Sequence, residues 1–87
     1  MNALRRLARV RDARVETDGE GRPTQIDGHR VETIRERWIV EEGWWTNAPV
    51  RRAYVEVVLA TGALEIVFHD LRGGGWHRHA STGMRRR

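Results

Sequence analysis

The chain has 87 residues with 16 Arg, no Lys, 12 acidic residues, no Cys and a formal net charge of +4. This length predicts a single domain with a small core, and the absence of Cys excludes a disulfide framework and a thiolate zinc site. The uncharged apolar runs are too short for a membrane span or a signal peptide, so the composition predicts a soluble, cytoplasmic protein with no membrane partner.

The positive charge is concentrated at the two ends of the sequence. Residues 1–14 carry five Arg against one Asp, and Arg85, Arg86 and Arg87 add three more. Residues 15–84 hold eight Arg against eleven acidic residues, so the body of the chain is mildly acidic. We therefore expect any contact with nucleic acid to depend on the ends or on local clusters of Arg.

The first residues, 1–12, are predicted to form a basic N-terminal arm or a short helix. A helix of this length is marginal in water unless it docks on a surface, so a solvated arm is the alternative. The β domain is predicted to span residues 13–80, and residues 81–87 are predicted to be a disordered basic tail. The helical spacing in the arm rests on Ala3, Leu4, Leu7 and Ala8.

Turn-forming residues divide the next part of the chain into two hairpins. The segment 18–21 contains two Gly and separates predicted strands at 13–17 and 22–27. Asp27-Gly28 is a two-residue turn signal, which should fold the following residues back onto the preceding strand.

Two later strands, 50–60 and 63–70, are separated by Thr61-Gly62. Treating this pair as a two-residue loop fixes the register and places six apolar side chains on one face, which we predict to be the core. The opposite face is mixed, and a shift of one residue would bring Glu56 and Glu65 to the core face. The predicted core pairs are Leu59 with Leu64, Val57 with Ile66 and Val55 with Phe68, and the mixed face pairs Val58 with Glu65, Glu56 with Val67, Tyr54 with His69 and Arg52 with Leu71.

The middle segment, residues 31–45, fits the apolar spacing of a helix and that of a strand. Its β-branched and aromatic content, and the hairpins on both sides of it, favour a strand. A glycine turn at 73–75 and a last strand at 76–80 follow later in the chain. The sequence therefore predicts an all-β fold, a small antiparallel meander of five or six strands closed into an SH3-like barrel.

Aromatic residues with Arg neighbours are the strongest binding signal. Trp38 and Tyr54 each lie close to two Arg in the sequence, as in stacking platforms with phosphate contacts. The alternative is that Trp fills a small barrel while Arg stacks over it as cover. Trp44-Trp45 would point to opposite faces of an extended chain, leaving one indole exposed. The predicted partner-binding or nucleic-acid-binding residues are Arg35, Arg37, Trp44, Trp45, Arg51, Arg52 and Tyr54.

Catalytic and metal-binding patterns are weak. His69, His77 and His79 could supply three metal ligands, but the register across the glycine turn is not fixed by the sequence, and we predict no metal and no cofactor. There is no phosphate-binding loop, and Glu41-Glu42 would face apart on a strand. Ser81 lies in the predicted tail, where a preorganised oxyanion site is not expected. We predict that the protein is not an enzyme.

The spacing of Trp, Arg and Tyr resembles that of a known family. The motif is Arg37-Trp38-x-Val40-Glu41-Glu42-x-Trp44-Trp45, then Pro49-x-x-Arg52-x-Tyr54, Phe68-x-Asp70-Leu71 and Gly75-Trp76. Through it, residues 13–79 resemble a small uncharacterised bacterial domain, which is free-standing or similar to the C-terminal tail of ImuB-like proteins, the inactive Y-family polymerase subunits of mutasomes. The resemblance implies a compact β-sheet domain near DNA repair or translesion synthesis, with a mutasome or polymerase subunit as partner. It supplies no catalytic residues, and Val55 and His77 stand where aromatic residues are common.

These observations lead to one functional expectation and one alternative. The expected function is a non-catalytic accessory module in DNA repair or translesion synthesis that binds a partner protein, with nucleic acid as a further candidate ligand. The alternative is a homo-oligomerisation domain with no nucleic-acid role, whose mixed face pairs with a second copy. The residues expected at that self-association face are Tyr54, Val58, Val67 and Leu71.

Overall fold

The computed structural model describes residues 10–43 and 45–79. The predictions made for residues 1–9, Trp44 and residues 80–87 lie outside this part of the chain. The described residues form one antiparallel sheet of seven strands in the order β1-β7-β6-β5-β4-β3-β2, and contain no helix that could cross a membrane. The strands are β1 (Val10–Asp12), β2 (Val15–Thr17), β3 (Pro23–Ile26), β4 (His29–Glu42), β5 (Val50–Leu59), β6 (Leu64–Asp70) and β7 (Trp76–His79).

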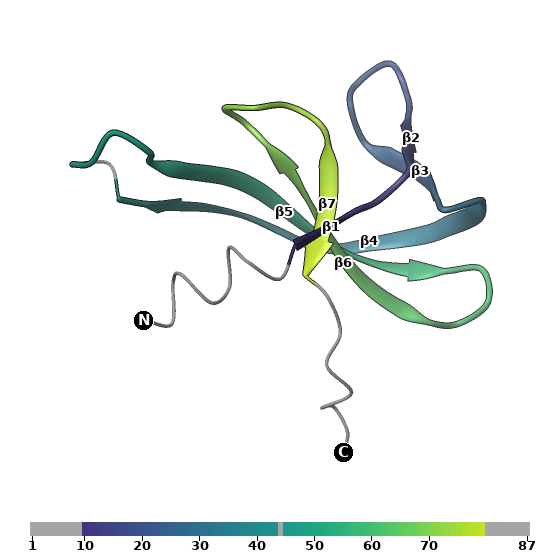
Figure 1. Cartoon of the computed structure of the whole chain (residues 1–87). Coiled ribbons are helices and arrows are strands. Elements are labelled where there is room, and N and C mark those ends of the chain that lie inside the picture. Colours follow the sequence, from purple (N-terminus) through teal and green to yellow (C-terminus); the bar gives the residue numbers. More distant parts are fainter. Residues whose placement is uncertain (1–9, 44, 80–87) are drawn as a thin grey trace.

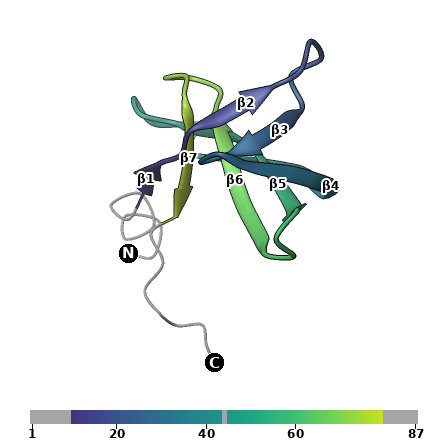
Figure 2. The same cartoon turned by 90° about the vertical axis from the view of Figure 1, so that its right-hand side faces the viewer.

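The sheet curls into a half-barrel (Figures 1 and 2). Its two edge strands, β1 and β2, are separated in the chain only by Ala13 and Arg14, so the chain itself links the two edges. The N–H of Ala13 donates to the carbonyl of Trp76 (3.0 Å), and the N–H of Asp27 donates to the carbonyl of Arg14 (2.7 Å). The predicted all-β, antiparallel class is confirmed.

The predicted strand count and the closed SH3-like barrel are wrong. The sheet has seven strands, and the additional one is β1, which lies within residues 1–12, the range predicted to be an arm. Three residues are too few to give a periodic apolar pattern in the sequence. Strand β1 forms through antiparallel pairing with β7, in which Arg11 faces Arg78. Val10–Asp12, which the sequence assigned to the arm, are therefore part of the sheet.

Two local predictions are confirmed. Ile26 faces His29 across the Asp27-Gly28 turn, and both turn residues have positive φ (50° and 85°), as a two-residue hairpin loop requires. The segment from 31 to 45, for which a helix was the alternative, contributes most of the strand β4.

The register of the β5–β6 hairpin differs from the predicted one. Its loop has three residues, Ala60, Thr61 and Gly62, and is closed by the N–H of Leu59, which donates to the carbonyl of Ala63 (2.9 Å). A two-residue loop would require positive φ at the β-branched Thr61, whereas the three-residue loop requires it only at Gly62, where φ is +95°. The pairing shifts by one residue, so that Val55 faces Val67, Tyr54 faces Phe68 and Glu56 faces Ile66.

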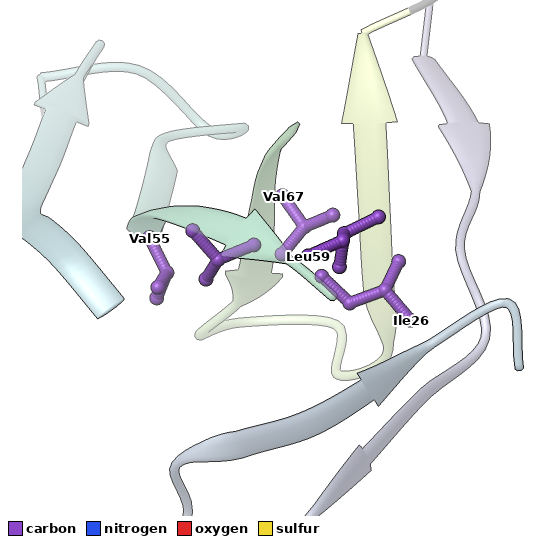
Figure 3. Close-up of a cluster of buried hydrophobic side chains, with 5 residues drawn as sticks. Ile26, Val55, Leu59 and Val67 are labelled. Atoms are coloured by element: carbon purple, nitrogen blue, oxygen red, sulfur yellow. The ribbon is translucent and has the colours of Figure 1, made fainter. Parts of the chain in front are cut away.

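The core occupies the inner face of the curled sheet (Figure 3). It lies between β3, β5 and β6, and residues from β2, β4 and β7 pack against it. Leu64 and Ile66, which the predicted register placed in the core, lie on the other face and are 55% and 45% exposed. The buried cluster consists of Ile26, Val55, Val57, Leu59 and Val67.

An ion-pair network joins three strands beside this core. Arg78 Nη2 on β7 lies 3.1 Å from Glu65 Oε1 on β6 and 2.5 Å from Asp27 Oδ2 at the end of β3. The shifted register brings Glu65 to the inner face, where Arg78 neutralises it. Asp27 Oδ1 also accepts the N–H of Arg14 (3.0 Å). The network therefore connects the β2–β3–β4 side of the sheet to its β6–β7 side.

Stability is expected to fall in acid because of this network. The backbone N–H of Arg14 and then the Arg78 guanidinium lower the pKa of Asp27 below its ordinary 3.8. A carboxylate with a depressed folded-state pKa stabilises the fold above its unfolded-state pKa, and this stabilisation is lost as the pH falls through the folded-state value. Asp27→Asn keeps an acceptor for Arg14 and suits the positive φ, so it should remove the charge alone.

Urea unfolding of both proteins between about pH 7 and pH 2 measures this contribution. The wild type is expected to lose more stability than Asp27→Asn over the interval below about pH 4. Parallel curves for the two proteins would show that the Asp27 charge does not contribute to the stability of the fold.

Candidate interaction surface

The outer face of β4–β7, opposite the core, carries a row of aromatic rings. Cross-strand pairing places Trp38 of β4, Tyr54 of β5, Phe68 of β6 and His77 of β7 next to one another in that order. Side chains of one face recur at every second residue of a strand, so this row is a direct result of the register. We call the side of the sheet that bears this row the outer face.

The rings of this row contact one another across the strands. Trp38 stacks on Tyr54 with ring centroids 5.4 Å apart and planes 8° from parallel. Tyr54 is 5.0 Å from Phe68, and Phe68 is 5.5 Å from both His77 and His79. Phe68 is only 1% exposed although it lies on the face opposite the core. The outer face is thus a second packed layer at this point.

Arg52 covers the centre of this layer. Its guanidinium carbon lies 4.3 Å from the centroid of the Phe68 ring, and its Nη1 donates to the Tyr54 hydroxyl (3.2 Å). A further hydrogen bond joins that hydroxyl and His79 Nε2 at 2.7 Å. Arg52 also helps to lower the pKa of Asp70, although the N–H groups of Gly73 and Arg72 at the following turn lower it more. Arg52 is therefore a buried structural cation.

Exposed apolar side chains continue the outer face from this layer. Trp38, at the β4 end of the aromatic row, is 37% exposed. Ile66 and Leu64 follow Phe68 at every second residue of β6, and Val58 faces Leu64 from β5. The outer face therefore presents an apolar strip from Trp38 across the buried rings to Leu64. We call Trp38, Val58, Leu64 and Ile66 the apolar strip.

Two carboxylates interrupt this strip. Glu36 and Glu56 face each other directly on β4 and β5, in the row between Trp38 and Leu64. Neither forms an ion pair with a cation in the described part of the chain. Like charges directly opposite each other on neighbouring strands destabilise the pairing of those strands. The pair is a local concentration of negative charge within an apolar surface.

The predicted binding residues do not form one surface. Arg52 and Tyr54 are buried in the outer layer. Arg51 is exposed on the opposite side of the sheet, and its Nε donates to Glu41 Oε2 (2.6 Å). Strand alternation separates neighbours such as Arg51 and Arg52, because successive side chains point to opposite faces.

The remaining predicted binding residues are dispersed. Arg37 faces Val55, so it is on the inner side of the sheet, away from Trp38, and Arg35 lies at a β-bulge between Ile34 and Glu36. Trp45 is exposed in the turn between β4 and β5, and Trp44 lies outside the described residues. The Trp38–Arg35–Arg37 and Tyr54–Arg51–Arg52 platforms are thus not assembled as the sequence spacing suggested.

The histidines are divided between the two faces. His69 stacks on Trp76 on the inner face (ring centroids 5.0 Å apart), whereas His77 and His79 lie on the outer face. His77 Nδ1 is 3.3 Å from Asp12 Oδ1. No group of three His, Cys, Asp or Glu in the described ranges is arranged to hold a metal ion.

The sequence reading missed Leu64 and Ile66 as surface residues. The signal that could have found them is the order of Thr61 and Gly62, because a β-branched residue does not suit the positive φ of a two-residue loop.

Comparison of the chain with protein-family models, curated proteins and solved structures found no match. Function is therefore inferred from the chemistry of the surface.

Proposed function

We propose that this domain is a non-catalytic interaction module that binds a partner protein through the outer face of β4–β7. The observation that carries the proposal is the apolar strip of Trp38, Val58, Leu64 and Ile66, in which Val58 is half-buried and the other three side chains are exposed. Large apolar side chains exposed together on one face of a sheet, with charged residues among them, are typical of protein interaction sites.

The negative charge of this face indicates that the partner carries basic side chains. Glu36 and Glu56 lie beside the strip, and no cation from residues 10–43 or 45–79 forms an ion pair with either. A Lys or Arg of the partner, placed between them, would remove their mutual repulsion and gain two unlike-charge contacts. The proposed partner segment therefore combines an apolar face with flanking basic side chains.

A protein fits the surface charges better than a nucleic acid. Residues 10–79 hold 10 Arg and 12 acidic residues, Arg51 is paired with Glu41 and Arg52 is buried. A nucleic-acid site needs a basic surface that neutralises phosphates. The resemblance to ImuB-like proteins supports placing the partner in a bacterial mutasome or polymerase complex, and a nucleic-acid contact would then be made by the partner or by the basic ends of the chain.

The proposal can be tested with a basic amphipathic peptide that has one Leu-rich face flanked by Lys. Titration of the isotope-labelled full chain, followed by NMR, is expected to shift signals of the outer face of β4–β6. Glu56→Lys should weaken binding by about tenfold or more while leaving the fold intact, because the new Lys would face Glu36. The matched control is Glu16→Lys on β2, which changes the net charge equally on an exposed strand away from the outer face.

Two results would contradict the proposal. Shifts confined to other parts of the sheet would show that the strip is not the binding surface. Equal weakening by Glu16→Lys and Glu56→Lys would show that the peptide responds only to net charge. In a parallel titration, salt-dependent binding of single-stranded DNA that persists without residues 1–9 would instead favour a nucleic-acid role for the β domain.

A further inference from the structure

Strand β4 has a long edge that no described strand covers. β3 pairs with β4 only at His29 and Arg30, whereas β5 pairs with the other edge of β4 as far as Glu42. From Glu32 to Glu41, the edge away from β5 has no neighbouring strand among the described residues. Such an edge presents unpaired backbone groups on which another strand can add.

The first half of this edge is protected and the second half is not. Two bulges interrupt β4, between Val31 and Thr33 and between Ile34 and Glu36, and bulges twist an edge away from pairing. After Glu36 the strand is regular and contains Trp38-Ile39-Val40, residue types that favour strands. The pairing-competent part of the edge is therefore the regular segment from Arg37 onward.

Hydrogen bonds of β5 show which backbone groups of β4 point to the open edge. The N–H of Leu59 and the carbonyl of Arg51 form hydrogen bonds on the β6 side of β5, and both residues are odd-numbered. Because the backbone groups of successive residues point to alternate sides of a strand, the even-numbered residues of β5 direct theirs toward β4. Tyr54 faces Trp38, so Trp38 turns its backbone groups toward β5. Because these directions alternate along a strand, the groups that point to the open edge belong to Arg37, Ile39 and Glu41.

We infer that this edge pairs with the same edge of a second copy of the chain, in an antiparallel register centred on Ile39. Around a two-fold axis, Ile39 would face its own copy, and Arg37 would face Glu41 of the partner subunit on both sides of the axis. Each of these pairs would exchange two backbone hydrogen bonds. The segment is self-complementary in charge, which is what an isologous contact requires.

Neighbouring registers separate Arg37 from Glu41 of the partner subunit. Centring the pairing on Trp38 would place Arg37 opposite Ile39 of the partner subunit, and centring it on Val40 would place Ile39 opposite Glu41 of the partner subunit.

The edge is accessible for this contact. Figure 1 shows the far half of the β4–β5 ribbon projecting from the rest of the sheet. Ile39, at the centre of the segment, is 57% exposed. The contact would leave the outer face of β5 and β6 open, so this self-association differs from the partner binding proposed above.

Charge reversal tests the register. The wild-type full chain is expected to show a monomer–dimer equilibrium in sedimentation velocity over a range of concentrations. Arg37→Glu places like charges on both sides of the axis and should weaken the dimer by about tenfold or more. The compensated variant combines Arg37→Glu with Glu41→Arg and Arg51→Glu, because Glu41 is paired with Arg51 within the chain, and it should restore the dimer. A strictly monomeric wild type, or a compensated variant no better than Arg37→Glu alone, would overturn the inference.

A single introduced cysteine tests the centre of the contact, since the chain has no Cys of its own. Two copies of residue 39 in this register have Cα atoms about 5.5 Å apart, within the range that a disulfide spans. Ile39→Cys should therefore form a covalent dimer on mild oxidation. Glu32→Cys, on the same edge, is the control and should form none, because its two copies would lie more than about 40 Å apart. Equal cross-linking of both variants would contradict the register, and neither outcome affects the test of the outer face.

Discussion

Val67→Lys is expected to unfold the domain, whereas Ile66→Lys is expected to leave it folded. Val67, on β6, is fully buried in the core cluster with Val55 of β5 and Ile26 of β3. An unpaired charge placed there costs several kcal/mol, which is comparable to the whole stability of a domain of this size, about 4–13 kcal/mol. Ile66 is half-exposed and faces Glu56, so a Lys at this position meets an unlike charge in water.

Circular dichroism and urea unfolding of the two variants decide between the registers. The two-residue loop predicted from the sequence would have placed Ile66 opposite Val57 in the core and Val67 opposite Glu56 on the mixed face, and would therefore reverse the order of the two effects. A folded Val67→Lys protein beside an unfolded Ile66→Lys protein would contradict the three-residue loop at Gly62.

The hairpins show how far local sequence determines this fold. Asp27-Gly28 specifies its own turn, because Asp and Gly both tolerate positive φ, and the predicted pairing of the flanking strands is correct. Thr61-Gly62 offers only one residue suited to positive φ, so the loop takes in Ala60 and the register moves by one residue. The alternating apolar pattern did not reveal the error, because Leu64, Ile66 and Phe68 read as a core face in isolation.

The candidate surface was less predictable than the strands. Each predicted contact between an Arg and an aromatic side chain requires both side chains to lie on the same face of the sheet. Proximity in sequence does not determine the face that a side chain occupies. Arg51 and Arg52 are adjacent, yet one pairs with Glu41 at the surface and the other is buried against Phe68. The position of Glu65 was also not predictable from its neighbours in sequence. This acidic residue lies on the inner face, where it forms an ion pair with Arg78 of β7.

This contrast leads to the second large effect, which compares Arg52→Ala with Arg51→Ala. Arg52→Ala removes the cation over the Phe68 ring, the hydrogen bond to Tyr54 and the cover of the outer layer, for an expected loss of about 2–3 kcal/mol. Arg51→Ala removes only an exposed ion pair with Glu41 and should cost less than about 1 kcal/mol. Both substitutions remove one positive charge, so net charge is matched.

Urea unfolding of the two variants, with binding of the basic amphipathic peptide measured on the folded proteins, separates structure from recognition. Arg52→Ala should lower the unfolding midpoint clearly and Arg51→Ala only slightly. Arg52→Lys should recover little, because an ammonium group lacks the flat guanidinium that stacks on Phe68 and bonds to Tyr54. If Arg52→Ala kept the stability of the wild type and lost peptide binding, Arg52 would be a partner contact, as its position in the sequence suggested, and the buried layer of the outer face would not depend on it.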